Sequence, residues 1–134
     1  MNNYKLFLDD ERIPGDVTWI RIPSILNDPW IIVRDYGSFI EYIKKEGMPS
    51  FISFDHDLAH EHYRASMYNP DKHYSNYYTD GTFKEKTGYE CAKWLIDYCI
   101  ENDLQFPEYS VHSMNPIGRE NIIGLIESYK KSKL

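Results

Sequence analysis

Four short apolar runs, separated by segments with helical spacing, constrain the fold of this 134-residue chain most strongly. The runs span residues 4–8, 30–36, 50–54 and 109–113. Runs of β-branched and aromatic residues between polar turns predict strands, and those that do not alternate with polar residues predict strands buried on both faces. Because strands that alternate with helices favour a parallel sheet with right-handed crossovers, we expect a three-layer α/β domain. Its sheet is four-stranded and mainly parallel, with flanking helices.

Three segments carry the spacing and end signals of helices. A capping-box pattern opens a helix predicted over residues 38–47, which Gly47 ends. A second capping-box pattern opens the helix predicted over residues 87–103. Asn115 followed by Pro116 indicates the N-cap and first residue of a last helix.

Two other segments fit no regular period. Residues 13–29 are predicted as a loop with one short helix around Ile25. Residues 59–86 are polar and tyrosine-rich, and a stretch of this length without an element is usually functional or disordered. We interpret it as an insertion within a single domain that could cover a site at the preceding strand end. Its tyrosines would either seal the insertion onto the domain or stack on unpaired bases.

Charge and composition limit the partners and the compartment. The net charge of −6 repels phosphate on average, so nucleic acid could bind only through a local basic patch, and we expect no binding to double-stranded DNA. We also expect no membrane partner. Cys91 and Cys99 lie two helical turns apart, about 12 Å along the axis, too far for a disulfide within an intact helix. They predict buried free thiols in a reducing compartment, and without a signal peptide or a long apolar run we expect a cytoplasmic protein.

Three of the four predicted strands end in ionisable residues. They are Asp9 and Asp10, then Asp55, His56 and Asp57, then His112. In an open parallel α/β sheet, ligands bind at the carboxyl ends of the strands. The sequence therefore predicts that these groups lie along one edge and form a site.

The acidic pair and the Asp-His-Asp triplet each have two interpretations. Asp9 and Asp10 could bind Mg²⁺ or Mn²⁺, or they could form a turn with an ion pair to Arg12. His56 is a natural proton-transfer group at neutral pH, and a flanking aspartate would orient it and raise its pKa. The alternative is a capping cluster for the segment that follows.

The last strand end offers a candidate phosphate site. Ser113 and Asn115 add hydrogen-bond donors beside His112, and the helix N-terminus that follows is suited to an anion. Arg119, one turn into that helix, could add a bidentate phosphate contact. Ordinary helix capping with a surface arginine explains these residues equally well.

The order of strands and acidic residues resembles a response-regulator receiver domain. In that fold the acidic pair, here Asp9 and Asp10, holds Mg²⁺, and the aspartate that closes the third strand, here Asp55, accepts phosphate. The final receiver strand with its lysine is absent from this sequence.

Four longer motifs give a closer resemblance. They are "LDDERIP" (8–14), "SFDHDL" (53–58), "TGYECAKWL" (87–95) and "HSMNPIGREN" (112–121). Together they resemble the cyclic-phosphate-processing receiver-like family of bacteria and phages, which has a receiver (flavodoxin-like) fold without phosphorelay. The resemblance implies action on cyclic phosphates, either 2′,3′-cyclic phosphate ends of RNA or cyclic nucleotides. It places the site on Asp9, Asp10, Arg12, Asp55, His56, Asp57, His112, Ser113, Asn115 and Arg119.

The leading hypothesis is a hydrolase that opens a cyclic phosphodiester. His56 and His112 would face each other as base and acid, with Asp57 or Asp55 orienting one of them. Arg12, Arg119 and the helix N-terminus at Ser113 and Asn115, or a Mg²⁺ or Mn²⁺ ion on Asp9, Asp10 and Asp55, would compensate the charge on phosphorus. The alternatives are a non-catalytic receiver that binds a nucleotide or protein partner, and a phosphorelay receiver that accepts phosphate on Asp55.

Overall fold

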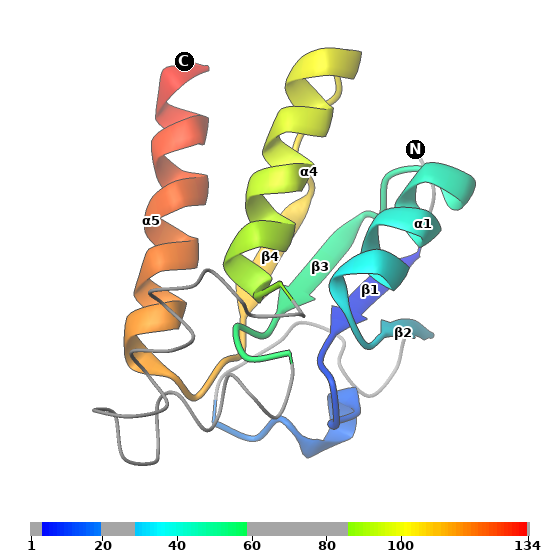
Figure 1. Ribbon diagram of the computed structural model, residues 1–134, viewed down its shortest axis with the longest axis vertical. Coiled ribbons are helices and arrows are strands. Elements are labelled where there is room, and N and C mark those ends of the chain that lie inside the picture. Colours follow the sequence, from blue (N-terminus) through cyan, green and yellow to red (C-terminus); the bar gives the residue numbers. More distant parts are fainter. Residues whose placement is uncertain (1–3, 20–28, 59–85, 134) are drawn as a thin grey trace.

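The four strands form one parallel sheet in the computed structural model, which describes residues 4–19, 29–58 and 86–133. The strands are β1 (Lys5–Leu8), β2 (Trp30–Val33), β3 (Phe51–Phe54) and β4 (Glu108–Val111). They lie in the order β2-β1-β3-β4 (Figure 1), and all three pairings are parallel. The predicted fold class is therefore confirmed. Since all strands run the same way, their carboxyl ends meet at one edge.

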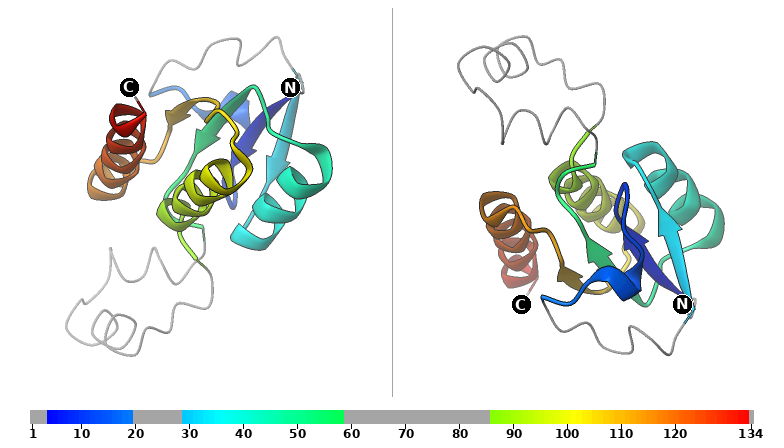
Figure 2. Two further views of the ribbon diagram at one scale, coloured as in Figure 1. Left: turned by 90° about the horizontal axis from the view of Figure 1, so that it is seen from above. Right: turned by 90° about the horizontal axis from the view of Figure 1, so that it is seen from below.

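The three helices, α1 (Tyr36–Glu46), α4 (Gly88–Asn102) and α5 (Pro116–Ser132), lie on one face of the sheet (Figure 2). The crossovers through α1 and α4 both move across the sheet from the β2 side towards β4. Right-handed crossovers in the same direction place their helices on the same face. The connection from β1 to β2 moves in the opposite direction, and Val17 in its described part packs on the other face, against Phe7 and Phe51.

The two faces of the sheet bury separate apolar clusters. Under the helices, strand side chains pack against helix side chains in a fully buried core made by Leu6, Leu8, Ile52, Phe54, Phe39, Ile43, Leu95, Ile122 and Ile126. On the other face, Phe7 and Phe51 pack with Val17, which follows the short 3₁₀ helix η1 (Pro14–Asp16). Within the described residues, the third layer is thus this short segment with its 3₁₀ helix and not an α-helix. The helix expected around Ile25 lies outside the described residues.

The helices lie where the sequence patterns predict them, but only one of the three predicted N-cap side chains makes the capping hydrogen bond. The N-cap of α1 is Asp35 and not Ser38, because the Asp35 carboxylate accepts a hydrogen bond from the Ser38 amide at 2.8 Å. Thr87 is the N-cap of α4, but its side chain makes no capping hydrogen bond. Asn115 caps α5 as predicted, accepting from Gly118 N at 3.1 Å.

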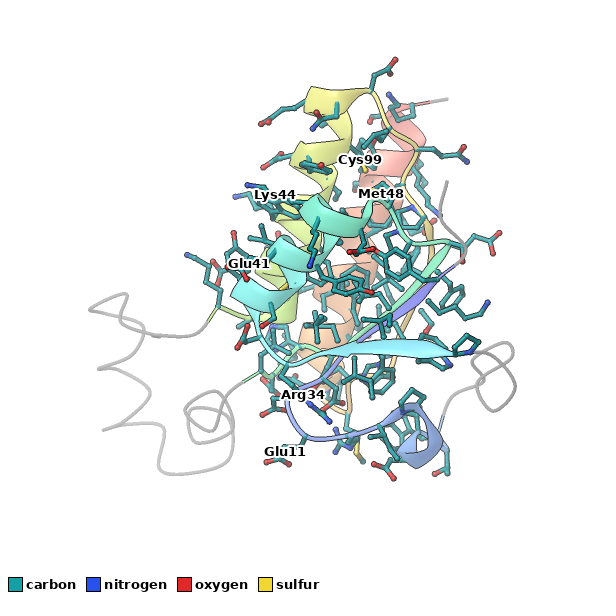
Figure 3. The ribbon with its side chains drawn as sticks, turned by 90° about the vertical axis from the view of Figure 1, so that its right-hand side faces the viewer. Glu11, Arg34, Glu41, Lys44, Met48 and Cys99 are labelled. Atoms are coloured by element: carbon teal, nitrogen blue, oxygen red, sulfur yellow. The ribbon has the colours of Figure 1, made fainter. Side chains whose placement is uncertain are left out.

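The two cysteines are free and buried in α4, as the spacing predicted. Burial raises the pKa of the Cys99 thiol to about 11. Cys99 lies towards the amino end of the sheet, whereas Arg34 and Glu11 lie at the carboxyl end (Figure 3). Among the described helices, none has the length and apolar content needed to span a membrane. Nearly all of the predicted insertion, residues 59–85, lies outside the described residues.

Candidate functional site

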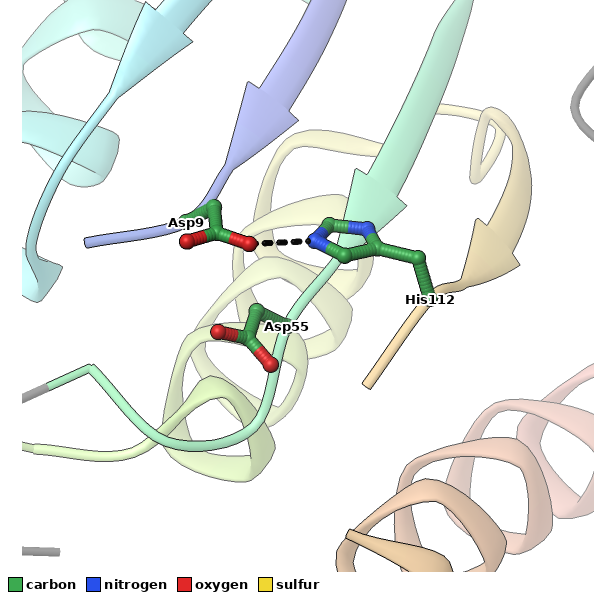
Figure 4. Close-up of side chains that lie close together, drawn as sticks. All are labelled: Asp9, Asp55 and His112. Carbon is green, nitrogen blue, oxygen red and sulfur yellow. Dashed lines mark hydrogen bonds and ion pairs between the residues drawn. The ribbon is translucent and has the colours of Figure 1, made fainter. Parts of the chain in front are cut away.

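Three polar side chains converge at the carboxyl edge of the sheet, deep in the protein. Asp9 follows β1, Asp55 follows β3 and His112 follows β4 (Figure 4). At most 2% of any of these residues is exposed, and one ligand atom from each lies within 4.8 Å of the others. The sequence prediction that these strand ends meet in one place is confirmed for this group.

His112 reaches from β4 across β3 to β1. Its Nε2 lies 2.9 Å from Asp9 Oδ2, and its Nδ1 lies 2.7 Å from Ser53 Oγ. Ser53 Oγ in turn lies 2.9 Å from Ser110 Oγ. The imidazole stacks on Phe7 with centroids 4.4 Å apart and planes 5° from parallel. Because alternate residues of a strand share a face, this row of hydrogen-bonded side chains lies on the face of Phe7, opposite the helices.

The direction of each hydrogen bond follows from the protonation of His112. Burial lowers the pKa of His112 more than the hydrogen bond and charge of Asp9 raise it, and the charge of Arg12 lowers it further. The imidazole is therefore neutral. Nε2–H donates to the Asp9 carboxylate, Nδ1 accepts from the Ser53 hydroxyl, and Ser53 accepts from Ser110. Each ring nitrogen of His112 and each of the two serine hydroxyls therefore has a hydrogen-bond partner.

Asp9 also organises the turn after β1. Its Oδ1 accepts hydrogen bonds from the backbone amides of Glu11 at 2.9 Å and Arg12 at 2.8 Å. Burial raises the pKa of Asp9, but these bonds and the one from His112 outweigh it and hold the pKa below its ordinary value. Arg12 Nη1 lies 3.7 Å from Asp9 Oδ2, and Arg34 Nη1 donates to the carbonyls of Asp9 and Arg12. Asp9 thus forms the turn and the ion pair to Arg12 that one interpretation predicted. It also lies in a cluster with Asp55, as a metal site would require.

Asp55 is the least stabilised charge of the cluster. Its Oδ1 accepts from the His56 amide at 2.8 Å, but its buried Oδ2 has no hydrogen-bond partner among the described residues. Burial, then the charge of Asp9, and further the charges of Asp57 and Asp10 raise the pKa of Asp55 to about 8. An orphaned buried oxygen beside other carboxylates is the arrangement that a proton or a cation would satisfy.

His56 and Asp57 form a second group beside the N-terminus of α5. His56 Nδ1 lies 3.1 Å from Asp57 Oδ1, and Asp57 Oδ2 accepts from Asn115 Nδ2 at 3.4 Å. The His56 side chain is 19% exposed, and its Nε2 makes no hydrogen bond to the described residues. Asn115 therefore links this pair to the cap of α5.

Two glycines allow the helices to approach the turn after β3. A Cβ atom on Gly88 would lie 1.7 Å from the carbonyl oxygen of Asp55. A Cβ atom on Gly118 would lie 2.3 Å from the His56 ring. Gly88 N also donates to the His56 carbonyl at 2.8 Å. The glycines in "TGYECAKWL" and "HSMNPIGREN" therefore have a packing reason, because a Cβ atom at Gly88 would force the backbone of Asp55 to move and one at Gly118 would force the His56 ring to move.

The remaining predicted residues lie around these two groups. Ser113 is buried, and its Oγ accepts from the Asn115 amide at 3.1 Å. Arg119 is exposed, and its Nε donates to the Val111 carbonyl at 3.3 Å, which holds it beside the edge strand β4. Asp10 is partly buried and close enough for its charge to raise the pKa of Asp55.

The expected facing of His56 and His112 is not observed. No hydrogen bond joins the two rings, because His112 lies on the Phe7 face and His56 packs beside α5. The strand register explains this separation. Ser53 pairs with Ser110, which places His112 level with Asp55 and not with His56.

Several site residues were missed by the sequence analysis. Ser53 and Ser110 complete the buried hydrogen-bond chain, and Ser53 was detectable as a polar residue two positions before Asp55 in an apolar strand. Trp19 Nε1 donates to the His112 carbonyl at 2.7 Å, and the Arg12 guanidinium lies 5.1 Å from the Trp19 ring centroid. No periodicity marks Trp19, so the sequence carried no signal for it.

Comparison with known proteins gives one family. The model of the "Cyclic-phosphate processing Receiver domain" family matches residues 4–128, which include all four strands and both groups of site residues. Searches of curated proteins and of solved structures gave no significant match. The fold, the convergent strand ends and this match over nearly the whole chain lead to one conclusion: the chain belongs to the family of cyclic-phosphate processing receiver domains.

Proposed function

We propose that this protein is a phosphoesterase that hydrolyses a cyclic phosphodiester to a phosphomonoester at the carboxyl edge of its sheet. The family supports a role in cyclic-phosphate processing. The observation that carries the proposal is the His56–Asp57 pair, whose imidazole is partly exposed and lies beside a carboxylate cluster. The substrates we expect are cyclic nucleotides or 2′,3′-cyclic phosphate ends of RNA.

His56 is the proton-transfer group in this proposal. When Asp57 accepts a hydrogen bond from Nδ1–H, the lone pair of Nε2 is free to take a proton from the attacking water, and the departing ribose oxygen takes its proton from solvent. Asn115 holds the other oxygen of Asp57, so the carboxylate is fixed at both ends. This arrangement sets both the tautomer and the orientation of the base, as the aspartate of a catalytic triad does.

His112 has a different role from the one that the sequence suggested. Both of its ring nitrogens are engaged, with Asp9 and with Ser53, and the residue is fully buried. We therefore assign His112 to hold Asp9 in place. The phosphate would contact Arg12 and the N-terminus of α5. The guanidinium charge and the positive end of the helix dipole would compensate the negative charge of the phosphate.

The carboxylate cluster fits a divalent cation. Asp9 and Asp55 present oxygens within reach of one another, the Asp55 Oδ2 atom lacks a partner, and Asp10 lies close by. Oxygen donors of this kind suit Mg²⁺ or Mn²⁺. When bound, such an ion would compensate the negative charge on the phosphate and on the departing ribose oxygen.

The test is turnover of 2′,3′-cyclic nucleotides and of cyclic-ended RNA, with and without chelator. We expect the wild type to produce a monophosphate and His56→Ala to lose at least about 100-fold in kcat. Asp57→Asn should also lower kcat, because an amide cannot stabilise the same imidazole tautomer and charge. Wild-type turnover that His56→Ala leaves intact would refute the assignment of the base.

A second candidate is a non-catalytic module that binds a cyclic nucleotide. The burial of His112 favours it, because an imidazole with both nitrogens bonded is a poor general acid. Calorimetry against a panel of cyclic nucleotides separates the two candidates. Binding without any product over hours would support the module and contradict the hydrolase.

A further inference from the structure

A groove between α4 and α5 begins at the proposed base. Its volume is about 900 Å³, and His56 lies among its lining residues. The side chains that argue for a ligand are Glu90 and Lys93 on α4, and Glu120, Asn121 and Ser128 on α5. The two helices lie side by side in Figure 1, and both begin at the carboxyl edge of the sheet. The groove therefore leads away from the proposed reaction centre along the helix layer.

The size and chemistry of the groove suit a nucleoside. Ligand pockets typically span 300–1,000 Å³, so the groove has room for a base and its ribose. An amide, a hydroxyl, carboxylates and an ammonium group offer both donors and acceptors. The edges of unpaired bases carry donors and acceptors that such groups recognise.

The charge of the groove argues against a second phosphate. Glu90 and Glu120 outnumber Lys93, so the charged lining has an excess of one negative charge, His56 aside. Arg12, by contrast, lies at the Asp9 side of the site, where the scissile phosphate is proposed to bind. A substrate with one phosphate at the sheet edge and an uncharged nucleoside in the groove matches this distribution.

We infer that the groove holds the nucleoside of a cyclic mononucleotide whose phosphate lies beside His56. The inference rests on the proposed function, since that function places the phosphate at His56. It adds the substrate class, because a nucleoside site beside the base favours a cyclic mononucleotide over a cyclic phosphate without a base and over a longer RNA end.

Gly124 offers a way to fill the groove without disturbing the fold. It lines the groove on α5, and a Cβ atom added there would meet no other atom within 4 Å. Gly124→Phe should therefore occupy the space of the nucleoside. Gly124→Ala should fold with a raised melting temperature, since alanine favours a helix over glycine. Lys131→Phe, at an exposed position of α5 outside the groove, is the matched control.

The kinetic test compares a nucleoside 2′,3′-cyclic phosphate with glycerol 1,2-cyclic phosphate, which has the same ring without a base. We expect Gly124→Phe to raise KM for the nucleotide at least tenfold, with little change for the glycerol compound and with Lys131→Phe like the wild type. An unchanged nucleotide KM, or an equal rise for both substrates, would overturn the inference. So would a cyclic-ended dinucleotide with a KM tenfold below that of the mononucleotide.

A binding experiment separates this inference from the proposed function. If the wild type turns over neither substrate, the hydrolase proposal fails, and NMR titration with the cyclic mononucleotide still tests the groove. Amide shifts at Asn121 and Ser128 that Gly124→Phe abolishes would support the nucleoside site. Absence of such shifts in the wild type at millimolar nucleotide would overturn it.

Discussion

Removing the charge of Asp55 should stabilise the protein in a pH-dependent way. Asp55→Asn keeps an oxygen that can accept from the His56 amide and removes the carboxylate whose Oδ2 is buried without a partner. In the wild type, the pKa of Asp55 is raised from 3.8 to about 8 by burial and by the neighbouring carboxylates. The folded state therefore keeps a proton that the unfolded chain releases at lower pH.

The sign and size of the effect follow from that difference in pKa. The free energy of unfolding of the wild type falls as pH rises from about 4 to about 8, because the unfolded chain then binds fewer protons than the folded one. At about 1.36 kcal/mol for each pKa unit, the loss is roughly 2 kcal/mol by pH 5.5, roughly 4 by pH 7 and roughly 6 above pH 8. Asp55→Asn lacks this loss, so its stability relative to the wild type should rise by these amounts.

The assay is urea unfolding of both proteins in chelator at pH 5.5, 7 and 8.5. Asp97→Asn, the same change at an exposed position of α4, is the control and should alter stability by at most about 0.5 kcal/mol at each pH. Adding Mg²⁺ or Mn²⁺ at pH 8.5 should stabilise the wild type more than Asp55→Asn. A stability difference between Asp55→Asn and the wild type that stays constant across the three pH values would refute the reasoning.

Two further substitutions test the contacts that build the site. Gly118→Ala would place a methyl group 2.3 Å from the His56 ring, so we expect kcat to fall at least tenfold. Lys131→Ala, at an exposed position of the same helix outside the groove, should remain active. Equal activity of the two variants would show that the His56 ring tolerates displacement. Ser53→Ala leaves Nδ1 of the buried His112 without its partner, so urea unfolding should show a loss of about 1–3 kcal/mol. A loss below about 0.5 kcal/mol would mean that the buried bond contributes little.

The strands and the edge where they meet were predictable because they depend on local apolar runs and on the rules for parallel crossovers. The positions of Asp9 and Asp55 at this edge were predictable because each residue directly follows a strand. The position of His112 was predictable because it directly follows the edge strand β4. Which side chains touch across the sheet depends on register, which the sequence does not display. One consequence is that His112 hydrogen-bonds both Ser53 on β3 and Asp9 after β1.

Other features required the packed structure. Asp35 replaced Ser38 as the cap of α1 because both residues can cap and only the path of the chain decides between them. The reason for Gly118 is a contact with His56 from a segment more than 60 residues earlier, which no local pattern encodes. The three α-helices share one face because, within the described residues, the β1–β2 connection contributes only the 3₁₀ helix η1.

The proposed function depends on His56, oriented by Asp57, opening a cyclic phosphate at the carboxyl edge of the sheet. The most direct measurement is ³¹P NMR of a nucleoside 2′,3′-cyclic phosphate incubated with the wild type, with His56→Ala and with Lys131→Phe. We expect the wild type and Lys131→Phe to convert the cyclic-phosphate resonance to that of a monophosphate, and His56→Ala to convert none. An unchanged cyclic-phosphate resonance with the wild type in Mg²⁺ or Mn²⁺, or equal conversion by His56→Ala, would contradict it.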